Sequence, residues 1–339
     1  MAGGGNPNHA PAGAPGGTGG QFVSGPEAGG APAKKATGKK FAKKPKKVTP
    51  TIKVEGGLEA LLAQLQDLNQ GISVGPLTTV EEIDQNIEKF WSKKVIEHVD
   101  RLFGNATGYC GDGQFHPKSN PNVNLNLFTC VFGKYRYPDN HAHLVTKEEY
   151  DRLSQDTSRW EKVYRGFTSI GPKRKNIMKG YLTADINNID IYGNGVFGTN
   201  VYTSTDYGYS YRDYASRDDK RVLYCLVDKQ ARIIDAHTLS SLMRNKLSKD
   251  YNYVTQKYEE KPLAKSIRNK VYQHLMNNGM EDNRADDIAN AFVAQLGSDM
   301  SLLAILLGYD YQVASSDRQR NILNLSKWYI ARRSEYEDY

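Results

Sequence analysis

The first fifty residues contain almost no material for a folded core. Residues 1–33 include eleven glycines and very few large apolar side chains. Such a segment cannot bury enough apolar surface to offset the entropy lost on ordering. We therefore predict that residues 1–50 form a disordered tail and that the folded chain begins near residue 51.

The formal net charge of +7 belongs to this tail. Eight of the 45 basic residues lie between Lys34 and Lys47, whereas Glu27 is the one acid among residues 1–50 and the chain has 38 acids. Subtracting the tail leaves 37 residues of each sign, and the remaining chain is neutral. A lysine run of this density binds polyanions such as DNA, RNA or an acidic protein surface by releasing counterions. A solubilising linker and a nuclear-import signal are the alternatives.

Cysteine and histidine spacing favours neither disulfides nor metal. Cys110, Cys130 and Cys225 are widely separated, with no C-x-x-C pair, and the histidines match no familiar ligand set. We expect a reducing compartment and no bound metal. The chain has no apolar run long enough to span a bilayer and no apolar signal core at its N-terminus, so we expect no membrane association.

Residues 51–140 are predicted to be a helical N-terminal segment. "LEALLAQLQDL" (residues 58–68) is amphipathic, and residues 79–104 carry apolar side chains at helical spacing, with Thr79 and Glu82 as a capping box. The segment "LNLFTCVFG" (residues 125–133) is predicted to be strand-like. These helices are expected to pack a core.

Residues 141–339 are predicted to be one α+β domain. Thr146 with Glu149 caps a short helix before the strand "KVYRGFT" (residues 162–168). Further strands are expected in "GVFGTNVYTST" and "KRVLYCLVD". A lysine-rich helical region and two apolar helices follow, the second ending at Gly308, and "NILNLSKWYIARR" (residues 321–333) is expected to be a strand pair or hairpin. Strands separated by helices, with few β-α-β alternations, indicate α+β.

Gly193, Gly195 and Gly198 spell G-x-G-x-x-G, the dinucleotide-binding fingerprint. In that motif the glycines follow a strand and open a helix whose N-terminus holds pyrophosphate. Here they lead into "TNVYTSTD", which is too rich in β-branched and aromatic residues to begin a helix. We therefore interpret the glycines as a loop before a strand.

Arg165 is the unexpected residue of its strand. It lies on the same side as Val163 and Phe167, where an apolar residue is expected, and Gly166 follows it directly. A salt bridge across the sheet is one explanation for the inward charge.

The order of three segments supplies another explanation. The arginine strand, the segment "GVFGTNVYTSTDYGYSYRDYA" and the late segment "LLAILLGYDYQV" with "NILNLSKWYIARR" together resemble the ADP-ribosyltransferase family. The likeness is closest to variants found in tailed-phage head proteins and polymorphic toxins, and it covers roughly residues 140–333. It implies a split mixed or antiparallel β-sheet with flanking helices. The glycine-rich N-terminus also resembles the leading segments of phage virion proteins, which implies delivery from a virion into the host cytoplasm.

The resemblance implies that NAD is the co-substrate. Arg165 would hold its phosphates with a bidentate fork, and Gly166 would let the backbone approach. Tyr202 would pack on nicotinamide, and a hydroxyl triplet would orient the catalytic acid. That triplet is Thr203, Ser204 and Thr205. A second stacking wall would come from one of the tyrosines that crowd the same region, Tyr207, Tyr209, Tyr211 and Tyr214, and we choose Tyr207. An ordinary exposed strand would show the same alternation.

The catalytic residues implied by the likeness are incomplete. The family's Q-x-E falls on Gln319 and Asn321, so Gln319 would position the acceptor, while asparagine stands where a glutamate should stabilise the oxocarbenium-like transition state. Glu335 and Glu337 form a second candidate pair, and Asp206 and Asp310 are further acids.

The implied activity moves ADP-ribose from NAD to a host protein or nucleic-acid acceptor, with release of nicotinamide. Two rivals stay open: a virion structural protein with a degenerate transferase fold, and a nucleic-acid-binding protein that uses its basic tail.

Overall fold

The computed structural model describes residues 72–105, 114–115, 125–137, 139–166, 171–183, 193–195, 197–215, 222–314 and 318–332. The expected tail, the helix expected at residues 58–68, and the acids Glu335 and Glu337 lie outside these ranges. The described chain combines helices with a mixed, open β-sheet, which confirms the α+β class.

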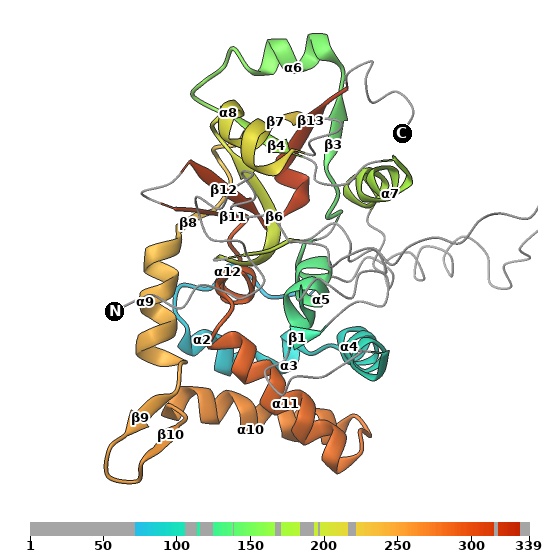
Figure 1. Cartoon of the computed structure of the whole chain (residues 1–339). Helices are drawn as coiled ribbons and strands as arrows, with labels where there is room; N and C mark the ends of the chain where they lie inside the picture. Colours follow the sequence, from blue (N-terminus) through green and yellow to red (C-terminus); the bar gives the residue numbers. More distant parts are fainter. Residues whose placement is uncertain are drawn as a thin grey trace, which may run out of the picture.

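One large sheet runs through the upper part of the molecule (Figure 1). Its strands follow the order β3 (His143–Val145), β13 (Trp328–Ala331), β7 (Val222–Asp228), β4 (Trp160–Gly166), β6 (Gly198–Ser204), β12 (Gln319–Ile322), β11 (Tyr311–Val313) and β8 (Ile233–Asp235). The pairs β3–β13 and β8–β11 are parallel, and the other pairs are antiparallel. β5 (Gly193–Gly195) adds to β6 as an antiparallel hairpin.

At the centre of the sheet, β4 and β6 pair over a very short length. β4 pairs with β7 along its whole length, from Trp160 opposite Asp228 to Gly166 opposite Val222. Between β4 and β6, in contrast, Tyr164 opposite Ser204 is the one pair in register among the described residues. The sheet therefore consists of two sections, β3–β13–β7–β4 and β6–β12–β11–β8, that separate beyond this pair.

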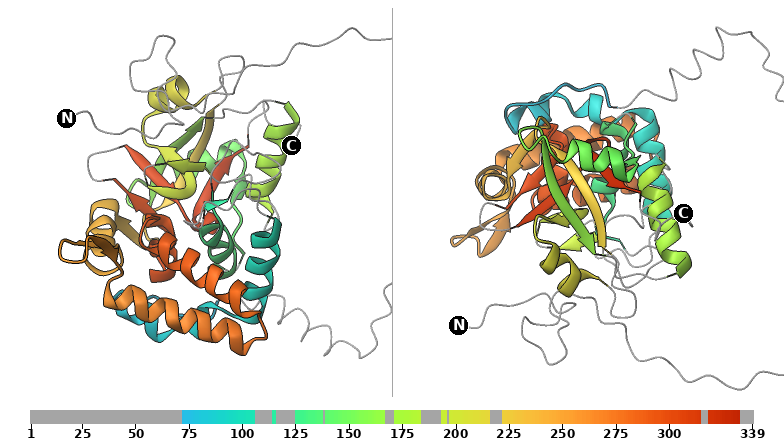
Figure 2. Two further views of the ribbon diagram at one scale, coloured as in Figure 1. Left: turned by 60° about the horizontal axis from the view of Figure 1, so that its bottom comes forward. Right: turned by 90° about the horizontal axis from the view of Figure 1, so that it is seen from above.

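Helices fill the space beneath the sheet (Figures 1 and 2). α12 (Met300–Leu307) packs on β6 and is buried from Ser301 onward, because it is also surrounded by α5 (Leu127–Arg136), α9 (Ala236–Lys246) and α11 (Asp282–Leu296). Asp299 caps its N-terminus, accepting from the backbone N–H of Leu302 at 3.0 Å, and Gly308 ends it in the left-handed region, as predicted. α10 (Pro262–Asn277) packs along α11 at the outer edge of this layer.

The N-terminal helices share this core. The indole of Trp91 contacts the rings of Phe128, Phe132 and Phe292 at centroid distances of 5.1–6.0 Å. One cluster of buried apolar residues extends from Ile72 to Ile330. Residues on both sides of position 140 therefore bury their apolar side chains together.

The long helix expected over residues 79–104 is wrong in its continuity. It is divided into α2 (Glu81–Gln85), α3 (Ile87–Phe90) and α4 (Lys93–Asn105). The backbone leaves the helical region at Trp91, with φ −95° and ψ 56°, because this geometry turns the indole into the core. Glu82 does accept from the backbone N–H of Thr79 at 2.9 Å, but the residue at the N-cap is Val80.

The strand expected at residues 125–133 is also wrong. Only Leu125–Asn126 is extended, as β2, and Leu127–Arg136 is the helix α5. The Oδ1 of Asn126 starts this helix by accepting from the N–H groups of Phe128 and Thr129. Because most of α5 is buried, its sequence lacks the polar face that marks a helix, and a short apolar run is ambiguous between the two structures.

The segment 321–333 does contain two strands, but they are not a hairpin. β12 pairs with β6 and β11, whereas β13 pairs with β7 and β3 in the other section of the sheet. A 3₁₀ turn at Leu325–Lys327 connects them. The hairpin alternative is therefore corrected.

Several elements lie where no specific element was predicted. They are α7 (Gly171–Leu182), α8 (Tyr207–Tyr209) with a π-helical turn η1 (Ser210–Tyr214), and β1 (Gln114–Phe115). The lysine-rich helical region expected before the two apolar helices is wrong in its continuity, because the hairpin of β9 (Asp250–Asn252) and β10 (Lys257–Glu259) separates α9 from α10. α6 (Lys147–Leu153) was predicted, and Thr146 caps it through the N–H of Glu149 at 3.2 Å. It packs Tyr150 with Trp160 and Leu226 on the face of the sheet that is opposite the main core.

Within the described ranges no single helix is long and apolar enough to cross a membrane. α11 and α12 reach the required length together, but they are bent by 94° at their junction.

Candidate functional site

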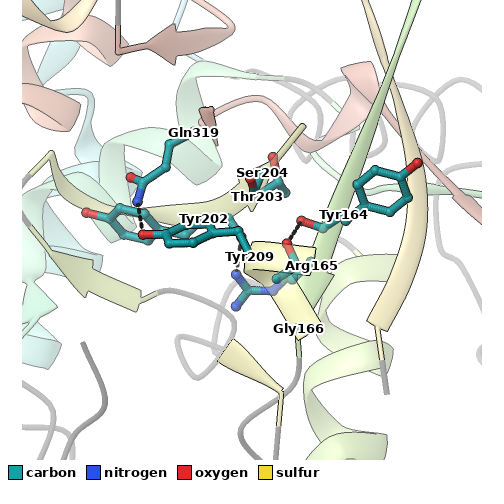
Figure 3. A pocket seen from close by; sticks show the side chains of 9 residues that line it. Tyr164, Arg165, Gly166, Tyr202, Thr203, Ser204, Tyr209 and Gln319 are labelled. Atoms are coloured by element: carbon teal, nitrogen blue, oxygen red, sulfur yellow. Dashed lines mark hydrogen bonds between the residues drawn. The ribbon is translucent and has the colours of Figure 1, made fainter. Parts of the chain in front are cut away.

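A hollow lies where β4 and β6 separate. It is lined by Tyr164, Arg165, Gly166, Tyr202, Thr203, Ser204, Tyr209, Ser210 and Gln319 (Figure 3). Six of these nine were predicted site residues, and they come from β4, β6 and β12, which are neighbours in the sheet. The structure therefore brings three sequence-distant segments to one place.

Arg165 enters the hollow from the core side of β4. Val163, two residues earlier on the same face, is fully buried, whereas Arg165 is partly exposed. Its Nη1 donates to the backbone oxygen of Tyr202 at 2.6 Å, and its guanidinium carbon lies 5.5 Å from the ring centroid of Tyr181 on α7. Its Nε is buried with no hydrogen-bond partner in the described part of the chain. One donor of the fork is thus unused.

A salt bridge across the sheet exists, but Arg165 does not form it. Glu161, four residues earlier on β4, accepts two hydrogen bonds from the guanidinium of Arg320, at 2.8 and 3.0 Å. No carboxylate pairs with Arg165 among the described residues. The charge of Arg165 is therefore available to an anionic ligand.

The hydroxyls of β6 are engaged by the protein itself. Tyr202 donates to the backbone oxygen of Gly198 at 2.7 Å, and Thr203 donates to that of Arg320 at 2.6 Å. The Oγ of Ser204 accepts from the N–H of Asp206 at 3.0 Å. Thr205 bonds the backbone oxygen of Arg318 and does not line the hollow.

The aromatic wall opposite Arg165 is Tyr209, not Tyr207. Asp206 caps α8 by accepting from the N–H of Tyr209 at 3.0 Å, and Ser210 donates its hydroxyl to the backbone oxygen of Tyr164 at 3.0 Å. These two bonds hold α8 and its π-helical turn across the ends of β4 and β6. Short π-helical turns recur at functional sites. An aspartate is a favoured N-cap residue, so Asp206 is the sequence signal from which the start of this helix could have been predicted.

Tyr207 lies outside the hollow, which corrects its predicted place. It is 40% exposed and stacks on Tyr211 at a centroid distance of 5.8 Å. Its ring also contacts Tyr164 of β4 and Tyr224 of β7, on the face of the sheet opposite Arg165.

The two late-strand residues behave differently. Gln319 lies opposite Ser204, and its Nε2 contacts the hydroxyl of Tyr209 at 3.3 Å (Figure 3). Asn321 lies opposite both Tyr202 and Gln312 and is fully buried, so it does not reach the hollow. Both of its amide atoms lack a hydrogen-bond partner within the described ranges. Asn321 is therefore a core residue rather than a ligand contact.

The lining contains no carboxylate. Asp206 is occupied by its cap and by an ion pair with Arg318. These contacts, the N–H of Tyr209 first, lower the pKa of Asp206. Asp310 is buried elsewhere, accepting from the N–H of Arg232 and from Asn324. No cluster of three or more His, Cys, Asp or Glu side chains that would hold a metal occurs in the described part of the chain.

The hollow is small as it stands. Its volume is about 30 Å³, room for a water molecule, whereas small-molecule sites span roughly 300–1,000 Å³. The residue types suit a phosphate and a planar ring, but the described geometry does not enclose a dinucleotide. A ligand of that size requires the two sections of the sheet to separate further.

A buried polar layer supports β6 from below. Asp299 accepts from the N–H of Thr199 at 3.1 Å, and the amide of Asn200 donates to the hydroxyl of Ser301 at 3.0 Å. Burial raises the pKa of Asp299 to about 6, against the backbone hydrogen bonds from Leu302 and Thr199, which lower it. These contacts fix the start of the strand that carries Tyr202 and Ser204.

Comparisons with known proteins add no relative. No protein-family model matches the chain, and neither a search of characterised proteins nor a search of solved structures finds a match. The function therefore has to be argued from the geometry of the site.

Proposed function

We propose that the protein is an NAD-dependent ADP-ribosyltransferase whose NAD site is the hollow between β4 and β6. The observation that carries the proposal is the adjacency of three strands that hold Arg165, Tyr202 with Ser204, and Gln319. These are the elements whose order in the sequence resembles the family. Their meeting around one hollow supports an ADP-ribosyltransferase-like sheet, in which β4 and β6 separate beyond the pair of Tyr164 and Ser204.

Each residue has a role in this proposal. Arg165 holds the pyrophosphate of NAD with its partly exposed guanidinium, and Gly166 lets the phosphates approach the backbone. Tyr202 and Tyr209 present aromatic surface to the cationic nicotinamide ring. Gln319, already bonded to Tyr209, positions the acceptor.

The reaction breaks the bond between the nicotinamide nitrogen and C1 of the ribose. Nicotinamide leaves with the bonding electrons, positive charge develops on the ribose, and a nucleophile of a host protein or nucleic acid attacks C1. A carboxylate stabilises that charge in the transition state. Since the described lining has none, the proposal assigns this role to Glu335 and Glu337, which follow β13 in the sequence.

The experiment compares NAD binding and nicotinamide release in the full-length protein. Arg165→Lys keeps the charge but removes the fork, so we expect it to weaken NAD binding about tenfold or more, as measured by calorimetry. Arg284→Lys is the matched control, because Arg284 pairs with Asp100 on the helical layer far from the site. Equal NAD affinities for both variants and the parent protein would contradict the assignment.

Catalysis is tested separately at the C-terminal acids. We expect Glu335→Gln with Glu337→Gln to abolish nicotinamide release and transfer of labelled ADP-ribose to host lysate while leaving NAD binding intact. Release that is unchanged in the double variant would remove these acids from the mechanism.

A structural role in a phage particle is the second candidate. The lining without a carboxylate and the buried Asn321 favour it, and it is supported by the compositional likeness of residues 1–33 to phage virion proteins. In that case NAD binds without any release of nicotinamide, or does not bind at all. Under the transferase proposal the same N-terminal segment takes the protein from the virion to the host cytoplasm, and polyanion binding by Lys34–Lys47 disappears on deletion of residues 1–50 without loss of NAD turnover.

A further inference from the structure

A second hollow lies on the other face of β4. It is lined by Lys147, Tyr150 and Asp151 of α6, by Lys162 and Tyr164 of β4, by Tyr224 of β7 and by Ala331 of β13. Lys162 and Tyr164 alternate with Val163 and Arg165 along the strand, so this hollow faces away from the arginine site. Its volume is about 230 Å³, close to the lower limit of roughly 300 Å³ for small-molecule sites.

Tyrosine rings dominate this face of the sheet. The rings of Tyr164 and Tyr224 lie 5.5 Å apart, and Tyr207 of α8 contacts both at 5.6 Å. Tyr207 then stacks on Tyr211. β4, β7 and the segment after β6 thus contribute one continuous group of aromatic side chains, of which Tyr207 is well exposed. Stacking on aromatic rings is how proteins bind nucleobases without regard to sequence.

The lining carries a net positive charge. Lys147 pairs with Asp151 at 2.6 Å, which neutralises the carboxylate of the hollow. Lys162 is exposed and has no ion-pair partner among the described residues. An ammonium group that stands two residues from Tyr164 on the same face suits a phosphate attached to a stacked ring.

We propose that this hollow binds a nucleotide, with the base against the tyrosines and the phosphate at Lys162. A neutral carbohydrate fits less well, because it carries no negative charge to pair with the ammonium of Lys162. Free mononucleotides and single-stranded nucleic acid share the required chemistry. The site lies on the opposite face of β4 from the proposed NAD site and does not involve the lysine tail.

Photocross-linking distinguishes the hollow from the tail. An oligonucleotide that contains 5-iodouridine is irradiated with the full-length protein, and the linked peptides are identified by mass spectrometry. Residues 1–50 contain no tyrosine, so a link to a tyrosine does not arise there. We expect links at Tyr150, Tyr164, Tyr207 or Tyr224. Links confined to residues outside this group would overturn the proposal.

Calorimetry with uridine monophosphate tests the same site without a polymer. We expect Lys162→Ala to weaken binding by about fivefold to tenfold, and Lys162→Arg to restore most of it. Lys257→Ala is the matched control, since Lys257 is an exposed lysine on a strand outside the sheet. Thermal unfolding confirms that each variant is folded.

The outcomes separate the ligand sources. Loss of both mononucleotide binding and tyrosine cross-links in Lys162→Ala identifies a nucleotide site open to free nucleotides. Loss of the cross-links alone, with no mononucleotide binding in the parent protein, identifies a single strand as the ligand. Cross-links and binding that are unchanged in Lys162→Ala would overturn the proposal. Arg165→Lys is expected to leave all these readouts unchanged, so failure of the NAD proposal is seen separately.

Discussion

The carboxylate of Asp299 fills the space that a side chain on Gly198 would need. A Cβ at Gly198 would collide with Oδ1 of Asp299 and with Oγ of Ser301, and the backbone there has φ +91°. We expect Gly198→Ala to lower the free energy of unfolding by roughly 2–4 kcal/mol, because strain in the left-handed region adds to the collision. Urea unfolding followed by circular dichroism measures the change.

Gly279 supplies the control for this substitution. Its φ is +85°, but apart from its neighbours in the chain no atom of the described residues lies within 4 Å of the position that a Cβ would take there. Gly279→Ala is therefore expected to cost about 1 kcal/mol, from backbone strain alone. Equal losses in the two variants would show that Asp299 moves aside without cost.

Asn321 is expected to tolerate an apolar replacement better than the acid that the family pattern would place there. The side chain is fully buried, and its amide makes no hydrogen bond within the described ranges. Replacing an unpaired buried amide by an apolar group of similar branching removes a desolvation penalty of about 1–3 kcal/mol. We expect Asn321→Leu to keep or raise the free energy of unfolding.

Asn321→Glu places a larger, charged group at the same point. It is expected to cost roughly 3 kcal/mol or more, and not to raise nicotinamide release above the rate of the parent protein, since the position does not reach the hollow. Chemical denaturation and a nicotinamide-release assay are the measurements. A stable Asn321→Glu protein that releases nicotinamide faster than the parent protein would restore this residue to the catalytic site.

The pKa of Asp299 gives the fold a dependence on pH. Its ordinary value of 3.8 is raised to about 6 by burial, so between these values the folded protein holds a proton that the unfolded chain releases. The stabilisation that this proton gives is complete below pH 3.8 and is lost as the pH rises to 6 and above. The shift corresponds to about 3 kcal/mol.

Asp299→Asn is the comparison, because it keeps the shape and cannot ionise. We expect the stability of the parent protein, relative to this variant, to fall by about 2 kcal/mol between pH 4 and pH 7. A relative stability that rises over this range would mean that the backbone hydrogen bonds to Asp299 outweigh its burial.

His98 acts in the opposite direction. Burial, with the charges of Arg101 and Lys134, lowers its pKa from 6.5 to about 4, and neither ring nitrogen has a partner among the described residues. The unfolded chain therefore takes up the proton first, so the stabilisation present above pH 6.5 is lost as the pH falls toward 4. In urea unfolding we expect His98→Phe to lose less stability than the parent protein over this window. Parallel pH profiles would contradict the assignment.

The parts of the fold that could be predicted are those fixed by residues close together in the sequence. Thr146 at the N-cap of α6 and Gly308 after α12 mark ends that depend on nearby backbone atoms, and both were identified. The helix α5 was missed because burial on all sides removes its polar face. The break at Trp91 was missed because it is imposed by aromatic partners on α5 and α11, which are distant in the sequence.

The strands that form the site were predictable, but the burial of each side chain on them was not. Alternation along its strand predicted that Arg165 points inward, and the resemblance in segment order placed Tyr202 beside it; the structure has both in the lining. The sequence could not place Asn321 in the core, since a strand position does not reveal how many layers cover it. Tyr209 rather than Tyr207 faces Arg165 because Asp206 and Ser210 fix the short helix, which spacing in a tyrosine-rich segment does not specify.

With Tyr164 and Ser204 as the single pair in register between β4 and β6, the sheet forms two well-paired plates, and their joint is crossed otherwise by the side-chain contacts of Arg165 with Tyr202 and of Arg320 with Glu161. Each plate is internally cross-linked by several registers of backbone hydrogen bonds, while the joint has one. Mechanical load applied to either half should therefore open the molecule along this line before it tears a plate. Because both hollows include Tyr164, a ligand that displaces this residue in one hollow changes the shape of the other.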